Sequence, residues 1–434
     1  MQVPFHGRAV RGWVLGDTED VPVRVLAVRR VLSPVRFFDR SSLALLRWVS
    51  ERYVAPLATV IGRSHPPRVV SEEPPGDAEP AGRSAPGVPP VAEAIIAAYR
   101  RGPELLAALA HGGGAFVLRP APEEEAAVVL EAVAACLSSG RRAIVLVPEA
   151  SPMPATARLL AEMLGDRVAV HLGGDRRERY RRWLDVAAGR HEVVVGTRAA
   201  VFAPLADLGL VVVGRESHRA HREDRAPYYH VRDVALERAR LAGAVCLLSA
   251  LCPSSEAAAL RLPEVSPATR RWPPVEVVRP GPEGRAPRLV RAVRETHRGF
   301  LFAPLPGYGI AQVCRSCGAA ASCATCGGVL RAEEGAVRCV VCGSPGRCAA
   351  CGAADFGIRR GGAERVEEWA GALAPVPVRR AKRPRAPRER EILVGGPRSS
   401  ATWAGSTLSW WASWTPISPI AGPASGRGSR RSPR

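Results

Sequence analysis

Eight of the eleven cysteines lie between Cys314 and Cys351, in four pairs with the spacing Cys-x-x-Cys. Two cysteines three positions apart can bring both sulfur atoms to one metal ion, and two such turns complete a tetrahedral four-cysteine zinc site. Four pairs therefore predict two structural zinc ions with no ligand left over. The alternative is a disulfide cluster or scattered thiols, which four equal pairs within forty residues disfavour. The pairs are Cys314/Cys317, Cys323/Cys326, Cys339/Cys342 and Cys348/Cys351.

Thiols clustered for zinc fit a reducing compartment. The first fourteen residues lack the apolar stretch of a secretory signal, and no apolar run is long enough to span a membrane. We therefore predict a cytoplasmic protein with no membrane partner, and we expect a monomer. Cys136, Cys246 and Cys252 lie singly in apolar stretches and are interpreted as core residues.

The charge indicates a polyanionic partner. The formal net charge is +20 and the sequence pI is about 10.6, a balance typical of proteins that bind nucleic acid. Lysine occurs once, at Lys382, and every other charged basic residue is arginine. A GC-rich coding sequence would produce the same bias, so part of the charge has a second explanation.

Strand and helix patterns alternate over residues 113–272, which predicts a parallel α/β sheet. Upstream, Arg8–Leu15 and Val23–Val31 resemble strands, and Ser41–Tyr53 has the apolar spacing of a helix. Downstream, Gly299–Ala303 reads as the first strand of a second α/β lobe, which the cysteine region interrupts.

Several motifs resemble the family of the bacterial replication-restart protein PriA, also called primosomal protein N′. The resemblance covers most of residues 1–396, and the cysteine region carries its most specific part. The other segments that carry it are Pro306–Gly309, Gly362–Glu368, Pro375–Val378, Val147–Glu149, Val195–Leu205 and Tyr229–Ala235.

The resemblance implies an α/β fold with a degenerate RecA-like lobe, a partial second lobe interrupted by a double four-cysteine zinc region, and a small N-terminal mixed β/α DNA-binding unit. The implied segments are a partial 3′-end DNA-binding domain (1–68), a linker with short helices (69–112), lobe 1 (113–275), the start of lobe 2 (276–312), the zinc region (313–353), the continuation of lobe 2 (354–396) and an irregular tail (397–434). We read the chain as truncated at both ends.

The family also implies how the cysteines pair, which spacing alone leaves open. One zinc ion would take Cys314, Cys317, Cys348 and Cys351, and the other Cys323, Cys326, Cys339 and Cys342. Six arginines fall in the part that resembles the DNA-binding domain, although a solvated face of a GC-biased protein is the alternative. They are Arg8, Arg11, Arg24, Arg29, Arg30 and Arg36.

The helicase motifs of the family are missing. A phosphate-binding loop needs a lysine and a Ser or Thr, whereas the segment from Arg119 to Glu125 contains prolines and glutamates. Gly214 stands where the family has its magnesium-binding aspartate. We therefore predict that the chain is not an enzyme, that ATP is not a cofactor, and that it resembles helicase-degenerate members from high-GC Gram-positive bacteria.

Other residues that could do chemistry give weaker signals. The arginines of Arg176–Arg182 surround their helix, so we favour a solvated helix over a DNA track. The histidines His218, His221 and His230 have no metal-ligand spacing. Three carboxylates, Glu149, Glu216 and Asp233, resemble remnants of helicase motifs rather than a hydrolase pair. The composition of the tail, with four tryptophans and no acidic residue, favours out-of-frame translation over a disordered interaction segment.

We therefore predict a replication-restart protein that binds branched or forked DNA at stalled forks and contacts other primosome proteins, without helicase activity. One alternative is an active ATP-dependent 3′-5′ DNA helicase. A second is a zinc-scaffolded interaction module without DNA affinity, and a third is a pseudogene product.

Overall fold

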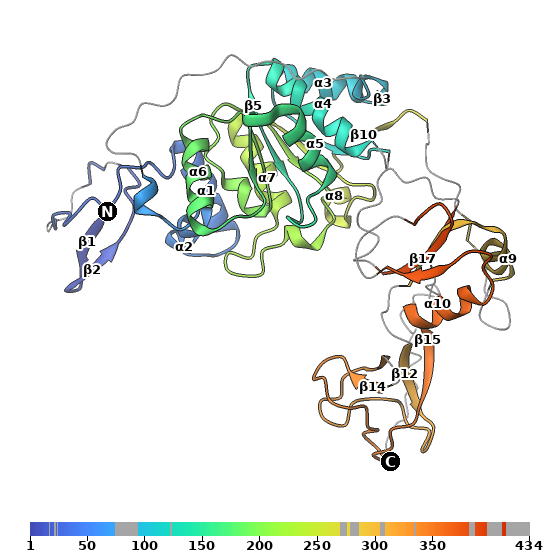
Figure 1. The fold of residues 1–434 in the computed structure, drawn as a ribbon. Coiled ribbons are helices and arrows are strands. Elements are labelled where there is room, and N and C mark those ends of the chain that lie inside the picture. Colours follow the sequence, from blue (N-terminus) through green and yellow to red (C-terminus); the bar gives the residue numbers. More distant parts are fainter. Residues whose placement is uncertain are drawn as a thin grey trace, which may run out of the picture. The chain divides into compact units, whose positions relative to one another are not determined.

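The computed structural model describes residues 1–16, 18–20, 23, 25–73, 94–121, 124–269, 276–277, 286–303, 309–333, 336–381, 387–396 and 410–413 (Figure 1). The chain divides into two units, residues 1–273 and residues 274–434, each with its own core. Across the described residues, no helix combines the length and apolar character needed to cross a lipid bilayer.

The first unit opens with a hairpin of β1 (Gln2–Phe5) and β2 (Arg8–Arg11). His6 and Gly7 form the turn with φ values of 44° and 75°, the positive angles that tight hairpin turns require. Beyond the hairpin, an isolated bridge joins Gln2 to Arg30.

The predicted strand over Val23–Val31 is wrong for its described residues, which form no strand apart from that bridge. The side chains of Val25, Leu26 and Val31 are 66%, 54% and 71% exposed. An apolar run becomes a stable strand only when it has a face to cover, and no such face is available to this segment within the described residues.

Two helices follow, α1 (Arg40–Arg52) and α2 (Leu57–Ser64). The carboxylate of Asp39 accepts a hydrogen bond from the backbone N–H of Ser42 at 2.7 Å and so caps α1. The buried stripe of α1 includes Leu45, Leu46 and Val49, which confirms the helix predicted over Ser41–Tyr53.

An eight-stranded sheet forms the centre of this unit, in the order β3-β10-β4-β9-β8-β5-β7-β6. All neighbours are parallel except β3 and β10 at one edge, so the central sheet is mixed. The predicted α/β fold class is confirmed. The strands are β3 (Tyr99–Arg100), β4 (Ala115–Leu118), β5 (Arg142–Leu146), β6 (Val168–His171), β7 (Val193–Gly196), β8 (Leu208–Val213), β9 (Val245–Ser249) and β10 (Glu264–Pro267).

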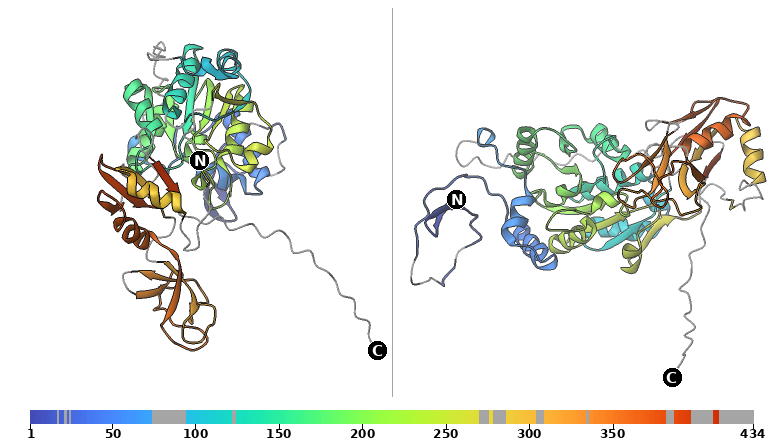
Figure 2. Two further views of the ribbon diagram at one scale, coloured as in Figure 1. Left: turned by 90° about the vertical axis from the view of Figure 1, so that its right-hand side faces the viewer. Right: turned by 90° about the horizontal axis from the view of Figure 1, so that it is seen from below.

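Helices cover both faces of the sheet (Figure 2). They are α3 (Gly102–His111), α4 (Glu125–Ser138), α5 (Ala155–Leu164), α6 (Arg176–Ala187), α7 (Val231–Ala242) and the short α8 (Ser255–Ala259). Helices α3, α4 and α5 pack on one face, and α7 packs on the other together with α1 and α2.

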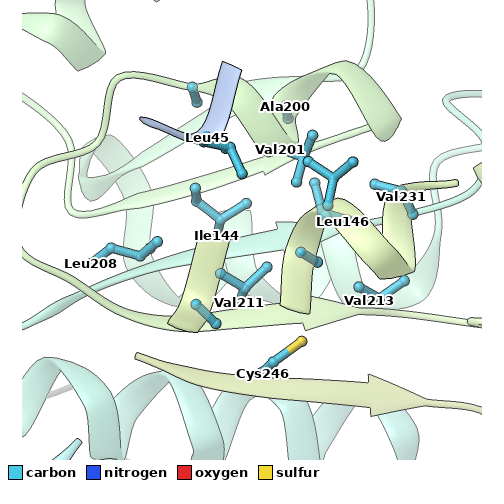
Figure 3. Packing of buried hydrophobic residues seen from close by; sticks show 14 of the residues in the cluster. Leu45, Ile144, Leu146, Ala200, Val201, Leu208, Val211, Val213, Val231 and Cys246 are labelled. Carbon is cyan, nitrogen blue, oxygen red and sulfur yellow. The ribbon is translucent and has the colours of Figure 1, made fainter. Parts of the chain in front are cut away.

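Alternate residues of each strand enter the two cores. In β8, Val211 and Val213 belong to the core that includes Leu45 of α1 (Figure 3), whereas Leu210 and Val212 belong to the opposite one. A strand that is buried on both faces reads as a continuous apolar run, which is why β8 is visible in the sequence.

The second unit contains a parallel four-stranded sheet in the order β16-β17-β11-β18, with helices α9 (Pro287–Glu295) and α10 (Ala363–Gly371). Its core includes Val293, Trp369 and Ile392. Strand β18 lies within residues 397–434, which the sequence predicts to be an irregular tail, and its pairing with β11 rather than a local pattern defines it. The strands are β11 (Arg298–Phe302), β16 (Val378–Arg380), β17 (Glu391–Gly395) and β18 (Trp410–Ser413).

After β11, the chain leaves this sheet to form an antiparallel one in the order β14-β13-β12-β15, and α10 follows its last strand. All eight clustered cysteines lie on this excursion. The strands are β12 (Gly309–Cys314), β13 (Leu330–Glu333), β14 (Ala336–Cys339) and β15 (Phe356–Gly361).

Candidate metal centres and nucleic-acid interface

The four Cys-x-x-Cys segments fold into the same turn. The carbonyl of the first cysteine accepts a hydrogen bond of 2.8–3.0 Å from the N–H of the glycine four positions on. That glycine has a φ between +71° and +73°, a left-handed conformation that side chains disfavour. In every turn the first cysteine is buried and the second is exposed. The glycines are Gly318, Gly327, Gly343 and Gly352.

The eight cysteines gather into two groups of four. The outer centre consists of Cys314, Cys317, Cys348 and Cys351, and the inner centre consists of Cys323, Cys326, Cys339 and Cys342. Within each group, all four sulfur atoms lie within 4.8 Å of one another. Among the described residues, these are the two clusters whose donor atoms could hold a metal ion.

The spacing of the sulfur atoms fits a tetrathiolate metal site. The distances Cys314–Cys351 and Cys317–Cys348 are 3.6 and 3.7 Å in the outer centre. In the inner centre, Cys326–Cys339 is 3.5 Å. Sulfur atoms at the corners of a zinc tetrahedron with bonds of ~2.3 Å lie about 3.8 Å apart, whereas a disulfide bond is ~2.05 Å long. Both centres therefore have the geometry of metal sites and not of disulfides.

The strands of the antiparallel sheet position the turns. Cys314 ends β12 opposite Phe356 of β15, and Cys339 ends β14 opposite Leu330 of β13. A bridge between Cys323 and Cys348 joins the turns of the two centres. Leu330 and Phe356 are buried with the first cysteines of the turns, so a small apolar core lies beside the metal ligands.

Backbone N–H groups favour the thiolate form of the ligands. The N–H groups of Cys326 and Thr325 lower the pKa of Cys323, and those of Cys351 and Ala350 lower the pKa of Cys348. A thiolate is the form that binds metal. A metal ion bound by four thiolates would have a full tetrahedral shell with no position for water, so an ion in either centre would be structural.

The N-terminal arginines are exposed. Arg11 lies opposite Gln2 on one side of β1, and Arg30 lies opposite Gln2 on the other side. Arg8 lies opposite Phe5 at the turn of the hairpin. Arg29 and Arg36 are also exposed, and none of these five arginines makes an ion pair with another described residue. Arg24 lies outside the described residues.

The arginines of α6 have partners within the chain. Arg177 and Arg181 both form ion pairs with Glu72, which belongs to the 3-10 turn Val70–Glu72. The guanidinium group of Arg176 donates to the carbonyl of Arg68 at 2.6 Å. This surface of α6 therefore holds the segment around Arg68–Glu73 and is not a free track for DNA.

The three histidines do not form a metal site. His221 is fully buried, and its Nε2 lies 2.8 Å from the carbonyl oxygen of Gly214. His230 caps α7, and Nε2 of His218 lies 3.7 Å from the carboxylate of Glu149.

Residues of the segments that resemble helicase motifs form a buried polar network that the sequence did not reveal. Glu216 is fully buried, and it accepts hydrogen bonds of 2.6 Å from Arg232 and 2.7 Å from the hydroxyl of Ser254. Arg232 also donates to Asp233 at 3.1 Å, and the hydroxyl of Tyr53 donates to the other oxygen of Asp233 at 3.1 Å. The partner of Arg232 lies sixteen positions upstream, beyond any local pattern.

The protein is of the mixed α/β class, and it carries two four-cysteine centres on the segment that leaves its second sheet. Residues 1–66 match the family described as the 3′DNA-binding domain (3′BD) of PriA. The probable replication restart protein PriA of Mycobacterium tuberculosis strain H37Rv is 32% identical over 396 residues, which cover 79% of this chain and 59% of the relative. The replication restart protein PriA of Treponema pallidum is 28% identical, with coverage of 86% and 60%.

Over most of its length the chain is similar to the PriA family of replication restart proteins. It spans about 60% of the length of the curated relatives it matches. It is also similar to the crystal structure of the Escherichia coli DEAH/RHA helicase HrpB, with a TM-score of 0.37 and 16% identity over 71% of this chain and 34% of that chain. The helicase domain of Pyrococcus furiosus Hef has a TM-score of 0.29 and 18% identity over 45% and 44%.

The prediction that the chain is not an enzyme is wrong. The curated relatives that the chain matches are PriA replication restart proteins, a family of ATP-dependent helicases. The prediction rested on a missing lysine and a missing aspartate. The absence of these two residues removes one phosphate ligand and one magnesium ligand. It does not exclude ATP hydrolysis, because arginine side chains and backbone N–H groups also bind phosphate.

Proposed function

We propose that this chain is a replication-restart protein that binds branched DNA at stalled forks and helps to assemble a primosome there. The observation that carries the proposal is the set of exposed arginines without ion-pair partners among the described residues of the segment that matches the PriA 3′ DNA-binding domain.

The register of the hairpin supports contact with a DNA end. Paired residues on neighbouring strands project to the same face, so Arg11 and Arg30 flank Gln2 on one face of β1. Arg8 and Phe5 share the other face, where the Phe5 side chain is 60% exposed. Guanidinium groups bind phosphate in a bidentate manner, and an exposed aromatic ring can stack on an unpaired base.

The two four-cysteine centres would each hold a zinc ion, which serves as a cross-link within residues 309–361. The donor sets Cys314/Cys317/Cys348/Cys351 and Cys323/Cys326/Cys339/Cys342 support zinc, since four thiolates in a tetrahedron are its usual structural shell. We infer that the stiffened lobe offers a surface to other primosome proteins, and that the chain acts as a monomer in the reducing cytoplasm, where thiolate sites persist.

Fluorescence anisotropy tests the DNA-binding function. The zinc-loaded chain is titrated with a fork that has a free 3′ leading-strand end, with the same fork whose 3′ end is paired within a duplex, and with plain duplex, each at low and near-physiological salt. We expect the free-end fork to bind most tightly at both salt concentrations.

Equal binding of all three DNAs that disappears at the higher salt would contradict the proposal, because the charge of +20 would then act without structural preference. No binding to any of them would favour a zinc-scaffolded interaction module. The matched control for hairpin variants is R190A/R240A, which removes two exposed arginines from other elements.

A further inference from the structure

Strands β3 and β10 (Figure 1) lie at one edge of the eight-stranded sheet, and β6 lies at the other edge. A basic pocket lies at the edge formed by β3 and β10. Its volume is about 330 Å³. Three arginines from separate elements line it: Arg100 of β3, Arg101 at the start of α3, and Arg261 after α8.

The strand register explains why these side chains meet. Arg100 lies opposite Ser266, and Glu264 is two positions before Ser266 on the same strand. Because alternate residues of a strand share a face, Arg100, Ser266 and Glu264 project to one side of this edge. Tyr99 and Val265 project to the other side, where they are buried in the core.

The positive charge of the pocket is largely uncompensated. The carboxylate of Glu264, which also lines the pocket, is paired with Arg119 at 3.3 Å. Arg101 lies 3.8 Å from Glu104, but both side chains are more than half exposed, so their attraction is weak. Within the described part of the chain, Arg100 and Arg261 make no ion pair.

The backbone holds two of the arginines in unfavourable conformations. Arg101 has a φ of 56° and Arg261 a φ of 51°, a region that residues with a side chain disfavour. Next to Arg101, a Cβ on Gly102 would overlap the carbonyl oxygen of Ile96, so the turn admits only glycine there. Strained backbone of this kind concentrates at binding sites. Here it fixes the direction in which the side chains of Arg101 and Arg261 leave the backbone.

We propose that this pocket binds one phosphate of a DNA backbone, as a contact of the first unit that is separate from the N-terminal hairpin. A phosphodiester is a compact anion whose oxygens accept paired hydrogen bonds from guanidinium groups, and three arginines offer more donors than one phosphate requires. The inference rests on the proposed DNA-binding function, and it adds the residues and the chemical group of a second contact.

The salt dependence of DNA affinity tests the pocket. We compare the wild-type chain with R100A/R101A/R261A and with R158A/R190A/R240A, which removes the same charge from exposed arginines elsewhere. For duplex DNA, each phosphate that a variant no longer neutralises lowers the slope of log affinity against log salt by about 0.9. We expect that change in the pocket variant relative to the control variant, whereas equal slopes in the two variants would overturn the proposal.

A conservative variant separates charge from folding. R100K/R101K/R261K keeps the positive charge, so we expect it to recover most of the salt slope if the alanine variant fails to bind the phosphate. If the lysine variant behaves like the alanine variant, the effect is structural and the proposal fails.

Inorganic pyrophosphate gives a readout that does not need DNA. It should raise the Tm of the wild-type chain and of R158A/R190A/R240A, and leave the Tm of R100A/R101A/R261A unchanged. A wild-type chain that binds no DNA but shows this pattern would contradict the proposed function while retaining the anion site. A Tm shift that is equal in all three chains would contradict the site itself.

Discussion

The hydroxyl of Tyr180 donates a hydrogen bond of 2.7 Å to the carboxylate of Glu73, a residue 107 positions earlier in the chain. The same carboxylate accepts hydrogen bonds of 2.6 Å from Arg68 and 2.7 Å from Ser33. Tyr180 is fully buried in α6, so Glu73 fastens the segment that follows α2 to the side of the large sheet. We call these hydrogen bonds of Glu73 with Tyr180, Arg68 and Ser33 the clasp. The clasp joins the part that matches the DNA-binding domain to the sheet that follows it.

We expect Y180F to lower the free energy of unfolding by about 1 kcal/mol, the usual worth of one hydrogen bond. Urea denaturation of the first unit within the full chain measures it. The control is Y228F, because Tyr228 is 64% exposed. If the two variants unfold at the same urea concentration, the hydrogen bond to Glu73 contributes nothing.

The clasp should also weaken in acid. Although burial raises the pKa of Glu73, the hydrogen bonds from Arg68, Tyr180 and Ser33 lower it below the ordinary value of 4.5. A group with a lowered pKa in the folded state stabilises above its unfolded pKa and loses that effect as the pH falls through the folded value. In E73Q, this part of the loss of stability below pH 4.5 should be absent, as acid titration of the unfolding midpoint would show.

Removal of metal should unfold the cysteine-bearing lobe. Structural zinc contributes about 10–16 kcal/mol at neutral pH in small zinc domains, more than a lobe with one small core can replace. We expect metal analysis to find two zinc ions per chain, and C314S to lose the ion of the outer centre while keeping the other. Cys252 is exposed, so its interpretation as a core residue is wrong, and C252S, which alters a cysteine outside both centres, should keep both ions. A chain that retains the lobe's amide protection after chelation would contradict the structural role.

The pair of Glu216 and Arg232 should be strongly coupled. R232M leaves a fully buried carboxylate without its cation, which costs about 3–5 kcal/mol. R240M, on the same helix, removes an exposed arginine and should change stability by less than about 0.5 kcal/mol. Restoration of most of the lost stability in E216L/R232M would show that the unpaired charge, and not the missing arginine, causes the loss. A loss of under about 1 kcal/mol in R232M would contradict the burial of the network.

His221 should make the first unit sensitive to mild acid. Burial lowers its pKa from 6.5 to about 4, and neighbouring His230 and His218 oppose its charge while Glu216 favours it. A histidine with a lowered pKa stabilises above its unfolded pKa and loses that effect as the pH falls. We expect a loss of about 2 kcal/mol between about pH 7 and pH 5 that H221Q lacks. H111Q, at an exposed position, should behave like the wild-type chain.

The hairpin arginines should govern the preference for a 3′ end. R8A/R11A is expected to remove the difference between the free-end fork and plain duplex, because these side chains lie on the two faces of β2. The salt slope should fall by roughly 0.7 for each phosphate of a single strand that the variant no longer neutralises. R190A/R240A carries the same charge change and should keep the fork preference. Retention of that preference in R8A/R11A would place the recognition elsewhere.

The amino-acid sequence is sufficient to predict an element where the neighbours of each residue lie within that element. The apolar runs of β7 and β8 are buried on both faces, so their composition alone identifies them as strands. The same reasoning fails for Val23–Val31, because exposure and not composition decides whether such a run pairs. Strand β3 escapes prediction because two residues carry no pattern, and β18 escapes it because only its pairing with β11 defines it.

The candidate sites likewise divide into those that a local sequence pattern predicts and those that it does not. Cysteine spacing predicts two four-cysteine centres because each turn is local, but the grouping of turns depends on the sheet that joins β12 to β15 and β13 to β14. The clasp at Glu73 and the pocket at Arg100 are made by residues more than a hundred positions apart, and no local pattern indicates either of them.

The nested arrangement of the metal centres gives their two loops different lengths. Cys326 and Cys339 of the inner centre are 13 positions apart, whereas Cys317 and Cys348 of the outer centre are 31 apart and enclose them. The entropic cost of closing a loop rises slowly with its length, so closing the inner loop costs slightly less than closing the outer one and would bring the ends of the outer loop closer together. At low metal concentration, the lobe would then form only in part. The inner metal would hold the β13–β14 hairpin, while the turns beside β12 and β15 would not yet be joined by the outer metal.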